Sequence, residues 1–150
     1  MRRIALCVET KHDIEKGGLM ELKEMIQRLA SEMEIETPKV DSQKAYVVAI
    51  NPTLAVTICD LAPGYSLYSL VVKCPIRKRE ELFIYLMRAN FLGQGTGGAR
   101  IGLDAEEKVL TLSVGFPYEL NYQLFKESVE DFVNYVVYWR NEIAKFEQEK

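Results

Sequence analysis

Apolar residues recur at helical spacing near both ends of the chain. Residues 19–33 carry them at steps of three and four, so a helix over this stretch has one apolar face. Residues from about 118 to the end repeat the spacing over a longer stretch. The two sets are Leu19, Leu22, Ile26, Leu29 and Met33, and Tyr122, Phe125, Val129, Phe132, Val136, Trp139, Ile143 and Phe146. Both stretches are predicted to be amphipathic helices.

Between these helices the pattern changes to short runs rich in β-branched and aromatic residues, which are typical of strands. Five strands are predicted, at 45–50, 54–61, 67–73, 99–103 and 109–114. The first three are separated by the turn-forming dipeptides Asn51-Pro52 and Pro63-Gly64, and the last two by charged residues. Such short connections predict antiparallel pairing.

A further helix is predicted over residues 77–92, and its pattern differs from the other two. Leu82 to Met87 are six apolar or aromatic residues in a row, which surround most of a helix. A helix that is apolar on nearly all sides needs cover on nearly all sides. A domain of this size rarely encloses a helix completely, so we expect a second chain to cover one side. A two-fold homodimer is the default closed assembly.

The resulting order is α-β-β-β-α-β-β-α, an α+β fold in which helices pack on a twisted antiparallel sheet. Residues 1–18 are predicted to be an irregular N-terminal extension, in which Ile4 to Val8 extend only briefly before Gly17-Gly18. Residues 19–150 are predicted to form one domain, since the chain shows no linker or internal repeat.

Composition and charge narrow the classes of function. The 150 residues are 48% hydrophobic, and 19 basic against 22 acidic side chains give a net charge of −3. This balance argues against nucleic-acid and anionic-membrane partners, which require a clustered positive surface. The apolar runs are too short to insert in a membrane. Three widely spaced cysteines, Cys7, Cys59 and Cys74, argue against a disulfide framework and favour a reducing cytoplasm.

The residues that usually carry catalysis or bind metals are scarce. His12 is the only histidine, and no cysteine or acidic cluster lies near it at ligand spacing. Asp104, Glu106 and Glu107 could be read as paired carboxylates, but a charged hairpin turn accounts for them. We therefore predict no catalytic, cofactor-binding or metal-binding residues, and no enzymatic activity.

The segment Gly93-Gln94-Gly95-Thr96-Gly97-Gly98 matches the glycine pattern of dinucleotide-binding loops. That mechanism requires a strand before the glycines and a helix after them, so that phosphate meets a helix N-terminus. Here the predicted helix precedes and the strand follows. We interpret the segment as the end of a helix followed by a turn with left-handed glycines.

Several segments together resemble one protein family. These are Leu86 to Gly93, the glycine-rich Gly95 to Ala99, Ile101 to Asp104, Val109 to Leu112, and the closing Tyr138-Trp139-Arg140. They are similar to the class I chaperones of bacterial type III secretion, the Tir-chaperone or CesT-like group. The order of elements and the small acidic chain agree with this resemblance.

The resemblance implies a homodimeric chaperone of the bacterial cytoplasm that hydrolyses no nucleotide. Such chaperones bind an N-terminal segment of one or more secreted effectors in extended form, partly as an added β-strand. They keep the effector soluble and secretion-competent, and help to deliver it to the export ATPase of the secretion apparatus. A Gram-negative host is implied as well.

The resemblance also assigns residues to two surfaces. The family's dimer contact uses the second helix and the strand after the glycine turn, which here gives Leu82, Phe83, Leu86, Met87, Asn90, Phe91, Ile101 and Leu103. Effector side chains are expected on the first helix and on the strand at the sheet edge. The residues chosen there are Leu22, Ile26, Leu29, Tyr46, Val48 and Ile50. The alternative interpretation is a structural or regulatory α+β dimer that binds another protein and has no role in secretion.

Overall fold

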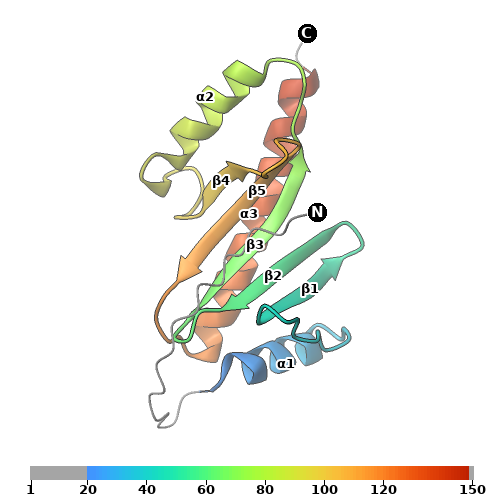
Figure 1. Ribbon diagram of the computed structural model, residues 1–150, viewed down its shortest axis with the longest axis vertical. Coiled ribbons are helices and arrows are strands. Elements are labelled where there is room, and N and C mark those ends of the chain that lie inside the picture. The colour runs from blue at the N-terminus through green and yellow to red at the C-terminus, as the bar shows by residue number, and fades with distance from the viewer. Residues whose placement is uncertain (1–19, 149–150) are drawn as a thin grey trace.

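A computed structural model describes residues 20–148, which form a five-stranded sheet and three α-helices (Figure 1). The elements are α1 (Leu22–Glu32), β1 (Ala45–Asn51), β2 (Leu54–Asp60), β3 (Tyr65–Lys73), α2 (Arg79–Asn90), the 3₁₀ turn η1 (Phe91–Gly93), β4 (Arg100–Leu103), β5 (Val109–Phe116) and α3 (Tyr122–Gln148). The predicted order and the α+β class are confirmed, with boundaries shifted by a few residues. The predicted extension over residues 1–18 lies outside the described residues.

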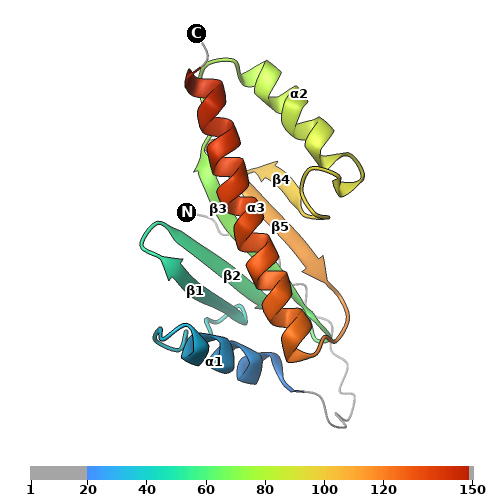
Figure 2. The ribbon, with the colours of Figure 1, turned by 180° about the vertical axis from the view of Figure 1, so that it is seen from behind.

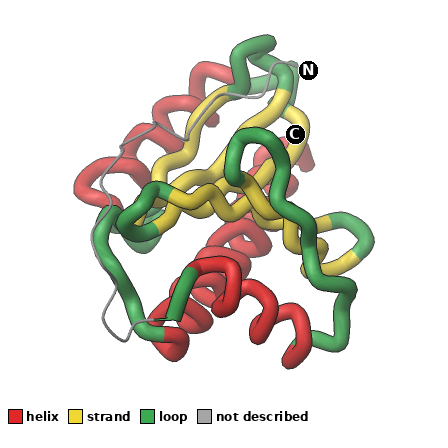
Figure 3. Tube along the Cα trace, turned by 60° about the horizontal axis from the view of Figure 1, so that its bottom comes forward, coloured by secondary structure: helices red, strands yellow, loops and turns green. Residues whose placement is uncertain are grey.

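The sheet has the strand order β1-β2-β3-β5-β4, and all neighbouring strands are antiparallel. The long helix α3 runs across one face of this sheet (Figure 2). Within residues 20–148 no helix covers the opposite face, which is turned to the viewer in Figure 1. Figure 3 shows the strands as one layer with helical segments beside it. The outer strands β1 and β4 are the two edges of the sheet.

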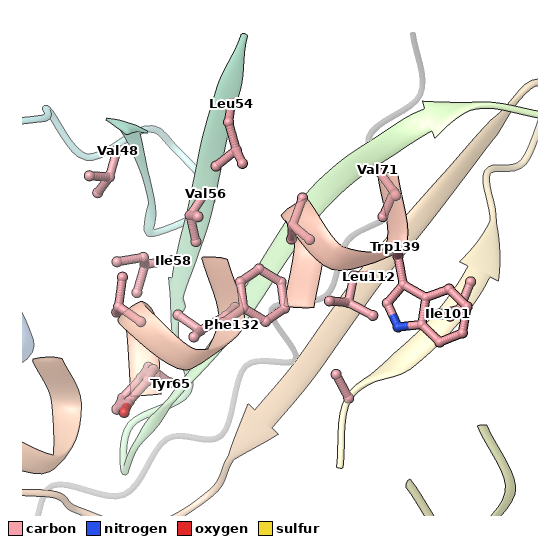
Figure 4. Close-up of a cluster of buried hydrophobic side chains, with 14 of the residues drawn as sticks. Val48, Leu54, Val56, Ile58, Tyr65, Val71, Ile101, Leu112, Phe132 and Trp139 are labelled. Atoms are coloured by element: carbon pink, nitrogen blue, oxygen red, sulfur yellow. The ribbon is translucent and has the colours of Figure 1, made fainter. Parts of the chain in front are cut away.

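The hydrophobic core lies between the sheet and the helices and draws on nearly every element (Figure 4). The strand alternation expected from the sequence is confirmed: Val48, Val56 and Ile58 are at most 1% exposed and point toward α3. Phe125 and Trp139 of α3 are buried in the same cluster. Each such side chain contributes roughly 1.5–3 kcal/mol of transfer free energy.

The glycine-rich segment is packed against α3, which confirms its interpretation as a turn after a helix. Gly93, Gly97 and Gly98 have φ values of 68°, 61° and 86°. The indole Nε1 of Trp139 donates a hydrogen bond to the carbonyl oxygen of Gly95 at 3.1 Å. A Cβ atom on Gly97 would lie 2.3 Å from the ring of Tyr135. The glycines therefore allow a close approach between this turn and α3.

The sheet is divided between β2 and β3. The two strands pair only from Thr57 opposite Tyr68 to Asp60 opposite Tyr65, so the first half of β2 has no ladder partner on β3. A β-bulge between Leu70 and Val72 alters the same part of β3 on its β5 side. The β1–β2 hairpin therefore separates from the rest of the sheet toward its turn.

Arg140 of α3 spans this separation. Its Nε donates to the carbonyl of Val71 at 2.6 Å, and its Nη2 donates to the carbonyls of Leu70 at 3.2 Å and Thr53 at 3.0 Å. Thr53 lies in the β1–β2 turn, so one guanidinium joins that turn to β3. The hydroxyl of Ser69 adds a bond to the carbonyl of Ala55 at 2.8 Å. These side chains replace part of the missing strand ladder.

The first prediction concerns the glycine turn. Gly97→Ala and Gly98→Ala both place a methyl group on a left-handed residue, which costs about 1–2 kcal/mol. Only Gly97→Ala also brings that methyl group against Tyr135, because nothing lies within 4 Å of a Cβ atom on Gly98. Urea unfolding should therefore show Gly97→Ala to be less stable by a further ~1–3 kcal/mol. Equal losses would show that the close approach to α3 is unimportant.

The second prediction concerns Arg140. Arg140→Met keeps an apolar stem but leaves three carbonyl groups without their donor, which should lower the free energy of unfolding by about 1–3 kcal/mol. Arg140→Lys should recover only part of this loss, because an ammonium group lacks the planar fork of a guanidinium. The control is Arg100→Met on the exposed side of β4, expected within about 0.5 kcal/mol of the parent. Indistinguishable losses for Arg140→Met and the control would contradict the bridging role.

Candidate functional site

The residues that the sequence assigned to effector binding are mostly part of the core. Ile26 and Leu29 of α1 and Tyr46 and Val48 of β1 are between 1% and 9% exposed. Their side chains fill the space between α1, β1 and α3. This corrects the choice of strand face, since the even-numbered side chains of β1 point inward and have almost no surface for a partner. Leu22 and Ile50 remain partly exposed.

The other side of β1 is accessible. The carbonyl oxygen of Ala45 accepts a hydrogen bond from the backbone N–H of Asp41, which lies outside the sheet edge, at 2.9 Å. Backbone groups alternate along a strand, so those of Val47 and Ala49 point toward the edge as well. Their side chains lie on the uncovered face of the sheet and are exposed. An isolated bridge between Val40 and Tyr46 covers only the start of this edge.

The uncovered face next to this edge forms a groove of about 790 Å³. Its walls come from the outward residues of β1 and β2, the middle of β3, the β1–β2 turn and the β4–β5 turn. The residues that line it are Asp41, Gln43, Ala45, Val47, Ala49, Asn51, Pro52, Thr53, Leu54, Ala55, Thr57, Cys59, Tyr68, Ser69, Leu70, Asp104, Ala105, Glu106 and Arg140. Most of these side chains are small or apolar, which suits an extended chain lying on the sheet.

Acidic residues line the groove at two places, Asp41 at one and Asp104 with Glu106 at the other. Asp104 accepts hydrogen bonds through Oδ1 from the backbone N–H groups of Lys108 and Val109, as expected for a hairpin turn. Glu106 forms an exposed ion pair with Lys108 at 2.9 Å. Burial raises the pKa of Tyr68, and the negative charge of Asp104 raises it further. The groove is therefore acidic at this end, and its tyrosine stays a neutral hydroxyl group.

The opposite edge of the sheet is closed by a side chain. The carboxamide of Asn90, at the end of α2, donates through Nδ2 to the carbonyl of Ile101 at 2.9 Å and accepts from the Ile101 N–H at 2.8 Å. This pair of bonds imitates a neighbouring strand at the centre of the short β4. Unpaired strand edges invite another chain, so β1 is the more open of the two edges.

The residues that the sequence assigned to a dimer contact fall into two groups. Leu82, Leu86 and Ile101, which were assigned to the dimer contact, are buried within the single chain and have almost no surface for a partner. Phe83, Asn90 and Leu103 are partly exposed, and Met87 and Phe91 are exposed at 72% and 65%. The reason is the helical period, which turns Leu82 and Leu86 toward the core and Met87 away from it.

Ile84 and Leu92 extend the exposed apolar surface of α2 and η1, although they were absent from the predicted contact. Ile84, Met87 and Phe91 follow each other at helical spacing and therefore form one stripe. The run of apolar residues contained this signal, but the run alone could not separate the inner face from the outer one.

The described residues contain no group of three or more side chains suited to hold a metal ion. His12 and Cys7 lie outside these residues, while Cys59 is buried and Cys74 is partly buried. In residues 20–148 no helix is both long enough and apolar enough to cross a bilayer. The accessible features are thus an open strand edge, a groove and an apolar helix face.

Two of the solved structures with similar folds are complexes. A chain in the structure of the HopA1-SchA chaperone–effector complex superposes with a TM-score of 0.61 at 17% identity, covering 79% of this chain and 92% of that one. A chain in the ExsC-ExsE complex gives a TM-score of 0.69 at 16% identity, covering 81% and 96%. At these identities the likeness shows a shared fold.

Sequence comparison identifies relatives directly. A protein of Chlamydia pneumoniae is 28% identical over 126 residues, which are 82% of this chain and 96% of that protein. The model of the Tir chaperone protein (CesT) family matches residues 24–140, which span every element from α1 into α3. The chain therefore belongs to the Tir chaperone protein (CesT) family.

Proposed function

We propose that this protein is a type III secretion chaperone of the bacterial cytoplasm. It binds an N-terminal segment of one or more secreted effectors in extended form, and keeps the effector soluble and competent for delivery to the export apparatus and its ATPase. Membership of the Tir chaperone family supports this function. A chain with a similar fold in a chaperone–effector complex supports it as well. The proposed function involves neither catalysis nor a cofactor.

The observation that carries the proposal is the open edge of β1 beside the groove. Backbone N–H and C=O groups at such an edge bind another strand with little regard to its sequence. The exposed side chains of Val47 and Ala49 continue this edge onto the uncovered face of the sheet. A partner strand could therefore pair with β1 and rest its side chains in the groove, which would provide the selectivity.

The groove also offers the apolar surface that is needed to offset the entropy cost of ordering a partner segment. Ordering a disordered segment costs roughly 1–2 kcal/mol of backbone entropy for each residue. Hydrogen bonds along one edge offset only part of this cost, since each contributes a net 0.5–1.5 kcal/mol or so. Apolar burial must supply the remainder, and Val47, Ala49, Ala55 and Leu70 offer exposed apolar surface next to the edge.

The proposed chaperone is a homodimer that associates through α2. Ile84, Met87, Phe91 and Leu92 form a contiguous apolar surface at one end of the molecule. This stripe is the outer side of the helix whose apolar sequence first suggested a second chain. A two-fold contact between two copies of the stripe would bury it while leaving both β1 edges accessible, since α2 and β1 lie at opposite sides of the sheet (Figure 1).

A backbone substitution tests the β1 edge. The full chain should enrich a secreted protein from its own bacterium, and a purified N-terminal fragment of that protein should bind it. Ala49→Pro removes the outward N–H group while remaining compatible with an edge strand. Titration calorimetry should show roughly tenfold weaker binding, consistent with the loss of one interchain hydrogen bond.

Ala49→Val is the matched control, because it changes the side chain but keeps the N–H group, and it should bind within about threefold of the parent. Equal binding by Ala49→Pro and Ala49→Val would reject strand addition at β1. Failure to enrich any secreted protein would reject the chaperone function itself.

A second substitution tests the dimer contact. Met87→Asp places a carboxylate in the apolar stripe, and two-fold symmetry places it there twice. Each buried carboxylate costs about 1–3 kcal/mol, so the two together should raise the dissociation constant of the dimer at least ~30-fold. Leu124→Asp, at a half-exposed position on α3, is the control and should leave the dimer intact. Light scattering measures both masses, and a dimeric Met87→Asp protein that remains folded by circular dichroism would rule out this interface.

A further inference from the structure

One side chain of the groove carries a charge that no carboxylate balances. The guanidinium of Arg140 lines the groove and is partly buried. Its three hydrogen bonds go to the backbone carbonyls of Thr53, Leu70 and Val71. Within residues 20–148 this guanidinium forms no ion pair, and its Nη1 group donates to no other group there. A partly buried cation whose bonds all go to neutral groups attracts a ligand of complementary charge.

The same hydrogen bonds fix how the guanidinium lies. All N–H groups of a guanidinium lie in one plane, so their acceptors lie close to that plane. Leu70 and Val71 supply acceptors from β3, and Thr53 supplies one from the β1–β2 turn. The plane therefore spans the separation between the hairpin and β3. Because α3 approaches from the covered side of the sheet (Figure 2), one flat face of the guanidinium is turned to the groove.

Exposed apolar side chains lie around this part of the groove. Leu70 is 40% exposed, and Pro52 and Ala55 are exposed as well. All three line the groove. The hydroxyl of Ser69 donates to the carbonyl of Ala55 at 2.8 Å and holds that residue beside β3. The small side chain of Ala55 next to the longer Leu70 leaves space for a large apolar group beside the guanidinium.

We propose that the segment bound in this groove presents an aromatic side chain, whose ring stacks on the guanidinium of Arg140 and packs against Leu70 and Pro52. The inference rests on the proposed function, because it names a feature of the segment that the chaperone binds. An aromatic ring attracts a guanidinium through the negative charge of its face. It also buries a large apolar area. A single partner residue thus uses both the unbalanced charge and the apolar surface around it.

A carboxylate of the partner is the other ligand that would suit a guanidinium, and the groove disfavours it. Asp104 and Glu106 line the same groove, and neither forms an ion pair with Arg140. An acidic side chain of the partner would approach these like charges, which weakens binding. It would also leave the exposed apolar surface of Leu70 uncovered, whereas a ring removes that surface from water.

The position of Arg140 determines which part of the segment carries the ring. A partner strand paired with β1 lies two strand spacings, or about 10 Å, from β2, and Arg140 lies beyond β2. Side chains of the paired residues are too short for that distance. β1 ends at Asn51, and a segment that leaves the edge there crosses the hairpin with about three extended residues. The ring therefore belongs to a residue about three positions beyond the paired part.

A peptide selection on the full chain tests the inference without any effector. Random peptides long enough to span the groove are displayed on phage and selected on the immobilised protein. We expect the selected peptides to share an aromatic residue at one position. In the bound peptide, ring currents should shift the Nε–H signal of Arg140, which is assigned by its loss in Arg140→Lys. Replacing the aromatic residue by cyclohexylalanine keeps the apolar bulk, and should abolish the shift and weaken binding about three- to tenfold.

A pair of matched variants places the peptide on the protein. Leu70→Ala removes apolar surface beside Arg140 and should weaken binding of the selected peptide at least about threefold. Leu124→Ala, at a similarly exposed position on α3, is the control and should bind like the parent. Equal binding by the two variants would show that the peptide lies elsewhere, and would overturn the proposal.

Other results would overturn the proposal as well. These are a selection that yields no peptide, selected peptides that share an acidic residue in place of an aromatic one, and an Arg140 signal that does not shift. The N-terminal fragment of an enriched secreted protein should produce the same shift of Arg140. If that fragment binds without the shift, the aromatic contact is wrong while the chaperone function stands. The chaperone function itself is rejected only when no secreted protein is enriched.

Discussion

The structure depends on how one guanidinium compensates for an incomplete strand ladder. β2 leaves β3 after four residue pairs, which would expose backbone carbonyls inside a small sheet. Arg140 reaches from α3 to the carbonyls of Thr53, Leu70 and Val71, and so ties the tip of the β1–β2 hairpin to the rest of the sheet. Because these bonds come from behind the sheet, the front remains hollow. The groove lies at this separation, next to the open edge of β1.

Side chains alternate along β1, so the residues that stabilise the fold and those available to a partner lie on opposite faces of the strand. Its even-numbered side chains, such as Val48, are buried and hold the hairpin against α1 and α3. Its odd-numbered residues, such as Ala49, turn both backbone groups and side chains outward. Substitutions that change the outward set can therefore alter partner selection at little cost to the core. At the other edge Asn90 closes β4, so that one sheet presents one accessible edge.

Much of the fold could be predicted from the sequence, because local signals agreed with one another. The spacing of apolar residues in α3 and the turn dipeptides of the β1–β2–β3 meander gave the correct elements and their order. The glycine segment was also interpreted correctly, since a helix precedes it and a strand follows. Family membership followed from short segments around α2 and β4 and is confirmed by the match to residues 24–140.

The candidate site was harder to predict, for a physical reason. A buried Val48 and an exposed Val47 look alike in sequence, and only the packed sheet decides which face meets α3. The same holds for Leu86 and Met87 on α2. Arg140 appeared in the sequence only as part of the family-like segment Tyr138-Trp139-Arg140, because its bridging role depends on a separation of strands that no local pattern reveals. The groove likewise combines residues that are far apart in the sequence, from positions 41–70, 104–106 and 140.

Hydrogen exchange at the β1 edge tests the central claim most directly. The N–H groups of Val47 and Ala49 should exchange quickly in the free sheet edge and become protected when an N-terminal effector fragment binds, because a partner strand accepts their hydrogen bonds. Amides of α3 that are already protected should change little. Unchanged exchange at both residues in a saturated complex, with protection appearing elsewhere, would contradict strand addition at β1.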